Sequence, residues 1–343
     1  MSDYLFNVNA HQLRECLIED LKVGLVPMVG SSPGLGKSDV IRQISDDFNM
    51  ELFDMRVSQS DPVDMNGYPA EKNGRMTFRT PEYFPLETDP LPDGKDGWLI
   101  FFDEFNSGSK QTEAAAYKLL LDHAVYKYKL HPKCRFVAAG NLATDRAITN
   151  TQSTATTSRL IHYRLQYDHL IWIQWANAHD IDHRIISLIK FDPDIGHKFD
   201  PDTDELTFPC PRTWAFASKV INGRAAIDQI TKIRLAGTVG QGAATTLATF
   251  IEIYADLPTI EQIMNNPGSG WTVPTEQSRQ FAITTMLSHN TDATNIKKMI
   301  TAIKRLPIEF QVITFKDIYN RKPELKRDPA IIKWIAENAD VMF

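Results

Sequence analysis

Short apolar runs alternate with helix-like segments through the first half of the chain. The run at 98–102, Trp-Leu-Ile-Phe-Phe, contains no polar residue, which is typical of a strand buried on both faces of a parallel sheet. Near the N-terminus Leu13, Leu17 and Leu21 share one helical face, and Asn9 suits its N-cap. The pattern predicts strands at 25–29, 51–57, 98–102, 135–139 and 162–165, and further helices at 38–44 and 111–121.

Beyond about residue 168 the predicted strands give way to helices. We therefore expect an α/β domain over residues 1–168, with a parallel sheet flanked by helices, and a helical region over 169–343. No internal repeat or low-complexity segment interrupts this order. The predicted helices of the second region span 171–177, 182–189, 212–221, 245–254, 276–287, 296–306 and 330–338.

A long segment at 58–95 is rich in Pro, Gly and Asp and separates two predicted strands. Inside it Asn73-Gly74 lies between two short β-like stretches, which is a good hairpin signal. The segment is too long for a simple connection, so we interpret it as a functional insertion. The alternating stretch at 125–130 is predicted to be one arm of a second hairpin.

Composition narrows the class of protein. The 343 residues suffice for about two domains, and their net charge of −6 includes no basic block. This balance argues against wrapping nucleic acid as the main task, although it leaves a local basic pore open. The Trp residues at 172, 175 and 214 are expected in the core rather than in a base-stacking platform.

Three widely spaced cysteines, Cys16, Cys134 and Cys210, indicate a reducing compartment without a disulfide framework. The sequence contains no Cys-x-x-Cys pair, so we expect no metal site built from these cysteines. The first residues carry no apolar run of signal-peptide length, and no stretch approaches the ~18 apolar residues of a membrane span. We expect a cytoplasmic protein without membrane contact.

The most specific motif is Ser-Ser-Pro-Gly-Leu-Gly-Lys-Ser at 31–38, between a predicted strand and a predicted helix. This context is typical of a phosphate-binding loop, in which Gly34 and Gly36 let successive N–H groups point at phosphate oxygens. Ser31 stands where the motif usually has its first Gly, and Ser tolerates unusual backbone angles less well. The residues assigned to ATP binding are Ser32, Pro33, Gly34, Leu35, Gly36, Lys37 and Ser38.

Two further strand ends carry polar residues that complete this site. Asp103 and Glu104 follow the apolar run at 98–102, where ligands bind in open α/β sheets. Asp103 and the Ser38 hydroxyl are the predicted Mg²⁺ partners, and Glu104 is the predicted base that activates or orients water. Asn141, at the end of the next predicted strand, could hydrogen-bond the γ-phosphate and the water.

Taken together, these motifs resemble those of an AAA+ ATPase, and more narrowly the MoxR branch, including phage and bacterial members of the dynein-related group. The resemblance covers residues 10–220 and rests on the ordered set of the phosphate loop, Asp103-Glu104-Phe105-Asn106, Ala138-Ala139-Gly140-Asn141, Ser158-Arg159-Leu160 and Pro211-Arg212-Thr213-Trp214. It implies a helical lid and C-terminal extension after residue 168, and a ring, usually hexameric, with ATP and Mg²⁺ between neighbours.

The resemblance also implies roles for individual residues. Asn141 would be sensor 1, Arg159 the arginine finger that reaches the neighbour's γ-phosphate, and Arg212 sensor 2 on the lid helix. A guanidinium suits the finger role, because phosphoryl transfer spreads charge over equatorial oxygens. Arg146 and Arg164 compete for that role. The insertion at 58–95 would line the pore or one ring face.

Three functions remain open at this stage. The favoured one is an ATPase that remodels or assembles a protein partner, and relatives often work with a protein that carries a von Willebrand factor A domain. The second is a nucleic-acid motor or loader, which the acidic balance disfavours. The third is a nucleotide-switched scaffold with slow turnover, which the Ser31 departure keeps open.

Overall fold

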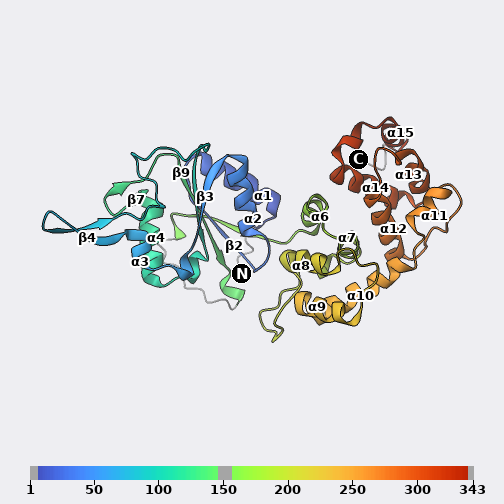
Figure 1. Cartoon of the computed structure of the whole chain (residues 1–343), viewed down its shortest axis with the longest axis horizontal. Helices are drawn as coiled ribbons and strands as arrows, with labels where there is room; N and C mark the ends of the chain where they lie inside the picture. The colour runs from blue at the N-terminus through green and yellow to red at the C-terminus, as the bar shows by residue number, and fades with distance from the viewer. Residues whose placement is uncertain (1–6, 146–156, 339–343) are drawn as a thin grey trace. The chain divides into compact units, whose positions relative to one another are not determined.

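The computed structural model describes residues 7–145 and 157–338. The chain divides into two compact units. The first comprises Met1–Asp168 together with Asp200–Asp202, and the second comprises His169–Phe199 and Thr203–Phe343. Within the first unit a sheet is flanked by helices, and the described residues of the second unit form helices joined by irregular segments, without a strand (Figure 1).

The first unit is built on a six-stranded, fully parallel sheet with the order β1-β10-β2-β9-β6-β3. This arrangement confirms the predicted fold class, an α/β parallel sheet flanked by helices and followed by a helical region. The strands are β1 (Asn7–Val8), β2 (Pro27–Ser31), β3 (Met50–Arg56), β6 (Gly97–Asp103), β9 (Cys134–Asn141) and β10 (Ile161–Leu165). The helices packed around it are α1 (Ala10–Lys22), α2 (Lys37–Asp47) and α4 (Lys110–Asp122).

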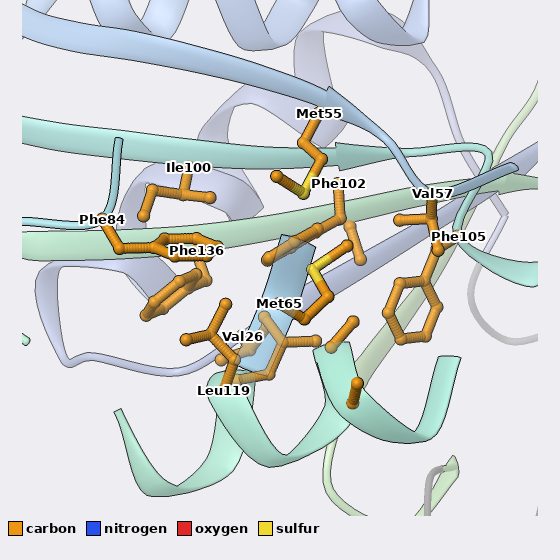
Figure 2. Close-up of a cluster of buried hydrophobic side chains, with 14 of the residues drawn as sticks. Val26, Met55, Val57, Met65, Phe84, Ile100, Phe102, Phe105, Leu119 and Phe136 are labelled. Atoms are coloured by element: carbon orange, nitrogen blue, oxygen red, sulfur yellow. The ribbon is translucent and has the colours of Figure 1, made fainter. Parts of the chain in front are cut away.

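Strand β6 is buried on both faces, as its unbroken apolar sequence predicted. Its Leu99 and Phe101 belong to the core that α1 and α2 cover. The alternate residues Ile100 and Phe102 belong to the core on the α4 side, where Leu119 meets the aromatic side chains of the sheet (Figure 2). Burying a side chain of this size stabilises the fold by roughly 1.5–3 kcal/mol, so both cores hold the strand in place.

The predicted N-terminal helix is present as α1, and its cap follows the sequence. The Asn9 side chain accepts a hydrogen bond from the N–H of Gln12, whose side chain in turn accepts from the N–H of Asn9. Leu13, Leu17 and Leu21 are buried against the sheet. Sequence spacing and capping chemistry therefore agree on where this helix begins and which face it buries.

The segment at 58–95 serves two structural purposes. Met65 of α3 (Pro62–Asn66) and Phe84 lie in the α4-side core, so part of the predicted insertion is core material (Figure 2). The rest forms an antiparallel hairpin of β4 (Tyr68–Lys72) and β5 (Arg75–Arg79) that turns at Asn73-Gly74, as predicted.

In contrast, the stretch at 125–130 is more than the single arm we expected, because both arms of a small hairpin lie at 124–129. Its arms are β7 (Ala124–Val125) and β8 (Tyr128–Lys129).

The second unit contains helices over most of its length. Trp172 and Trp214 are buried there, as expected, whereas Trp175 is only partly buried and stacks on His179. The helices are α6 (His169–Ala178), α7 (His183–Phe191), α8 (Pro211–Ile221), α9 (Gln229–Val239), α10 (Gln241–Ala255), α11 (Ile260–Asn265), α12 (Gln277–His289), α13 (Ile296–Ile303), α14 (Ile308–Arg321) and α15 (Pro329–Glu337). No helix among the described residues is long and apolar enough to span a membrane.

Two histidines meet inside the second unit. The rings of His183, at the start of α7, and His289, at the end of α12, have centroids 4.8 Å apart. Burial, followed by the charge of Arg321, lowers the pKa of His289 to about 4. Asp182 and Asp180 act weakly in the opposite direction. The folded protein therefore holds His289 neutral at pH values where an exposed histidine carries a proton.

We expect this histidine to make the second unit sensitive to mild acid. The unfolded chain protonates His289 near its ordinary pKa of 6.5, whereas the folded chain protonates it only near 4. Between these values the unfolded state binds more protons, so stability falls as pH falls. Thermal melts at about pH 7 and about pH 5 should show a smaller acid-induced loss for His289→Gln than for the parent. An equal improvement in His11→Gln, at an exposed position, would contradict this assignment.

Candidate functional site

The carboxyl ends of three neighbouring strands bring the candidate residues together. Strand β9 lies between β2 and β6, and all three run in the same direction. Ser31, which begins the Gly-rich loop, is in register with Asn141, while Phe102, before Asp103, is in register with Ala138. Side chains from residues more than a hundred positions apart therefore share one edge of the sheet.

The loop between β2 and α2 has the backbone that its glycines predict. Gly34 and Gly36 have φ values of +79° and +89°, in the left-handed region that favours glycine. Helix α2 begins at Lys37, so its N-terminal N–H groups and the positive end of its dipole lie at the loop. Ser31 is the last residue of β2 and has no positive φ, so the missing first glycine introduces no backbone strain.

Lys37 lies across the loop and contacts both neighbouring strands. Its ammonium donates to the Ser31 carbonyl at 3.0 Å and to the Ser31 hydroxyl at 2.8 Å. A longer contact of 3.5 Å reaches Oδ1 of Asn141. Ser31 is completely buried, and the hydrogen bond to its hydroxyl helps to position the lysine. Such a cation beside inward-turned N–H groups suits a chain of phosphates.

Asp103 and Ser38 are in direct contact. The Ser38 hydroxyl donates to Oδ2 of Asp103 at 3.2 Å, and the N–H of Glu104 donates to Oδ1 at 2.9 Å. A hydroxyl and a carboxylate are hard oxygen donors. Mg²⁺ takes only one or two such protein ligands and completes its shell with water and phosphate oxygens. The donor set therefore fits this ion, and the described residues contain no cluster of three or more His, Cys, Asp or Glu that would suit another metal.

Glu104 has an unusual backbone for its residue type. Its φ of +52° and ψ of +36° place it in the left-handed region, which costs a non-glycine residue about 1–2 kcal/mol. Strain of this kind is concentrated at functional sites. The Ser58 hydroxyl, at the beginning of the predicted insertion, donates to Oε2 of Glu104. Sequence reasoning missed Ser58, because nothing local indicates a contact that spans 46 residues.

Asn106 fixes the main chain of Asn141. Its amide nitrogen donates to the Asn141 carbonyl at 2.8 Å, and its amide oxygen accepts from the Asn141 N–H at 3.2 Å. This pair of bonds uses the space next to Gly140, where an added Cβ would lie only 2.3 Å from Oδ1 of Asn106. Asn106 was noticed in the sequence only as part of a motif, and its positioning role is visible only in the structure.

The arginines predicted to act in hydrolysis come from several different elements. Arg159 precedes the amino end of β10, whereas the phosphate loop follows the carboxyl end of its neighbour β2, a separation of about 17 Å along a five-residue strand. Its guanidinium donates to the Tyr117 hydroxyl at 3.1 Å, and this hydrogen bond raises the pKa of Arg159. Arg212 is an exposed residue in the first turn of α8, in the second unit. Arg164 lies near the carboxyl end of β10, in register with Gly30 of β2, and Arg146 lies outside the described residues.

Comparisons with known proteins add little to this geometry. No protein-family model matches the chain, and no curated protein matches it. The similar solved structures include NtrX from Brucella abortus in complex with ADP, 13% identical over 92% of this chain and 67% of that one, with a TM-score of 0.40. They also include a Cytophaga hutchinsonii protein provisionally described as an ATPase (13% identical, 97% and 89% covered, TM-score 0.39) and a RuvB mutant from Thermotoga maritima (12% identical, 90% and 83% covered, TM-score 0.34). Likeness at this level carries no functional argument, so the proposal below rests on the chain's own residues.

Removing the Asn106 side chain should weaken the site's framework. In Asn106→Ala the partly buried N–H and carbonyl of Asn141 both lose their partner, at a cost of about 1–3 kcal/mol in unfolding free energy. Urea denaturation followed by far-UV circular dichroism would measure this loss. Gln111→Ala, which removes an exposed amide side chain on α4, serves as the matched control. Equal stability of the two variants would show that Asn106 does not hold Asn141.

Proposed function

We propose that the chain is a Mg²⁺-dependent ATPase of the AAA+ class. The observation that carries the proposal is the convergence of Lys37, Asp103, Glu104 and Asn141 on adjoining strand ends beside a loop with two left-handed glycines. A phosphate loop alone would support nucleotide binding. The strand-end acid pair and the amide that contacts the lysine add the groups needed for hydrolysis.

In this proposal each side chain has one task. The loop N–H groups and Lys37 hold the β- and γ-phosphates, and the lysine exchanges its contacts with Ser31 for phosphate oxygens. Ser38 and Asp103 would hold Mg²⁺, which supplies charge neutralisation when it is bound. Glu104 accepts a proton from the attacking water, after its carboxylate leaves the Ser58 hydroxyl. Asn141 orients the same water.

Arg159 is proposed to act on the nucleotide of a neighbouring copy. Its separation from its own phosphate loop is about 17 Å along the sheet, which exceeds the reach of an arginine side chain. The finger role comes from the resemblance to AAA+ ATPases, and a finger at this distance would serve another subunit, so we propose a ring of six copies. Arg212 of α8 is proposed as the sensor above its own nucleotide, and its region as the lid.

The protein-remodelling role completes the proposal. The motif order is similar to that of the MoxR branch, whose members remodel or assemble protein partners, some with a von Willebrand factor A domain. The net charge of −6 and the buried tryptophans favour a protein partner over a nucleic acid. A MoxR-like chaperone activity is therefore the finer function that we propose for this ATPase.

Loss of the Lys37 charge should remove nucleotide binding. Lys37→Ala leaves the phosphate charge without its flexible counter-ion, so we expect ATP affinity to fall at least about a hundredfold. Isothermal titration with ATP and Mg²⁺ would measure the change. Lys22→Ala removes an exposed lysine in the last turn of α1 and should bind like the parent. An affinity within a few-fold of the parent in Lys37→Ala would refute the phosphate-loop assignment.

Replacing Glu104 should affect ATP hydrolysis but not ATP binding. Glu104→Gln keeps the shape of the side chain but cannot accept a proton, so ATP should bind normally while hydrolysis falls about 10²–10⁴-fold. Phosphate release and nucleotide titration would measure the two quantities on the same preparation. The variant should accumulate with ATP bound. Hydrolysis at the parent rate would exclude Glu104 as the group that activates water.

A mixing experiment tests whether Arg159 acts between subunits. Arg159→Ala should bind ATP normally and hydrolyse it slowly, because the guanidinium is needed most in the transition state. Mixing Arg159→Ala with Glu104→Gln creates interfaces that pair an intact Glu104 site with an intact Arg159, so activity should partly recover. Native mass spectrometry would first establish that subunits exchange. With exchange demonstrated, the absence of recovery at every ratio would rule out Arg159 as the residue that acts in trans.

A further inference from the structure

The β4–β5 hairpin has two faces of different chemistry. Side chains alternate along each strand, and the register pairs Tyr68 with Arg79 and Lys72 with Arg75. One face therefore consists of Tyr68, Ala70, Lys72, Arg75, Thr77 and Arg79, which we call the basic face. It carries three cations and no acid, in a chain whose net charge is −6.

The opposite face of the hairpin contacts the rest of the first unit through Phe78, while Met76 on the same face is exposed. Phe78 lies on it, and its ring centroid is 5.0 Å from that of Tyr126 in the turn of the β7–β8 hairpin. At the base, the Tyr68 hydroxyl donates to Oδ1 of Asp64 at 2.7 Å. These contacts fix the root of the hairpin and leave the basic face as the side away from Tyr126. Figure 1 shows the hairpin projecting from its unit.

The three cations of the basic face are exposed and lie close to one another. Lys72 and Arg75 are directly opposite each other, and like charges in that position destabilise a strand pair. Both are exposed, as is Arg79. None of the three makes a salt bridge or a side-chain hydrogen bond to any residue in the part of the chain that the structure describes. An anionic partner would relieve the repulsion.

We infer that the basic face is a docking surface for an extended acidic segment of a protein partner. Arg75 and Arg79 are four residues apart on one strand, about 13 Å, which matches the spacing of carboxylates four residues apart in another extended chain. Guanidinium groups bind carboxylates through two parallel hydrogen bonds, so these two arginines suit Asp or Glu side chains. The inference rests on the proposed function in that it names the chemistry of the remodelled partner.

A single-stranded nucleic acid fits this face less well. Sequence-independent binding of single strands uses several aromatic side chains on which successive bases stack. The basic face offers one aromatic ring, Tyr68, and its hydroxyl is already engaged by Asp64. The face therefore lacks the stacking platform that single-strand binders use, and we commit to the acidic protein segment as its occupant.

Fluorescence anisotropy on the full chain tests the inference without nucleotide. The probe is a short fluorescein-labelled peptide in which Glu alternates with Ser, and the same peptide with Lys for Glu is the charge control. We expect the acidic peptide alone to bind, with an affinity that falls as salt is added. Arg75→Glu should weaken binding at least about fivefold, because it turns an attraction into a repulsion. The double variant Arg75→Glu with Arg79→Glu should not bind detectably.

Lys133→Glu is the matched control, because it makes the same charge change at an exposed position before β9. It should bind the acidic peptide within about twofold of the parent. If Arg75→Glu fails to fold by circular dichroism, Arg75→Gln replaces it, with a smaller loss expected. Equal losses in the Arg75 and Lys133 variants, or no binding by the parent, would overturn the inference.

A labelled oligothymidine provides the second arm of the experiment. Tighter binding of this strand than of the acidic peptide, with the same dependence on Arg75, would overturn the inference in favour of nucleic acid. ATP turnover of each variant is measured in parallel, since the basic face contains none of the proposed hydrolytic residues. Normal turnover without peptide binding would reject the docking surface alone, whereas a parent without turnover would reject the proposed ATPase.

Discussion

The parallel pairing of β9 with β2 and β6 is the constraint on which the proposed site depends. It aligns Ser31 with Asn141 and brings Asp103 to the next strand end, although these residues are far apart in the sequence. Hydrogen bonds along the strands fix this alignment, because a shift by one residue would turn every side chain to the other face of the sheet. The contact of Lys37 with Ser31 and Asn141 follows from the same register.

Packing on both sides of the sheet gives this register its rigidity. The side chains of β6 alternate between two cores, so neither face can yield without disturbing the strand that carries Asp103. A rigid support also allows the strained backbone of Glu104 to persist, because the surrounding structure outweighs about 1–2 kcal/mol of local strain. The carboxylate of this residue is held by the Ser58 hydroxyl.

Much of this architecture could be predicted because its signals are local. The loop glycines, the apolar run of β6 and the Asn9 cap each specify their own structure within a few residues. The contacts of Ser58 with Glu104 and of Asn106 with Asn141 could not be read, because they depend on strand order. Helices α9, α11 and α14 were missed. In α9 and α14 the many β-branched residues, together with the aromatic residues of α14, weaken the helical signal. Met65 and Phe84 belong to the core, but their position in a Pro-, Gly- and Asp-rich segment gave no sign of it.

The two-sided burial of β6 has a consequence for how the molecule opens. Backbone amides in a strand that two cores enclose can exchange with solvent only when the whole unit unfolds, whereas amides of an exposed two-stranded hairpin exchange through local opening. We therefore expect the strand ends that carry the proposed chemistry and the hairpin that carries the basic face to open as separate cooperative units. Fluctuation, damage or sequence drift in the hairpin can alter what the protein contacts while the positions of Asp103 and Asn141 remain unchanged.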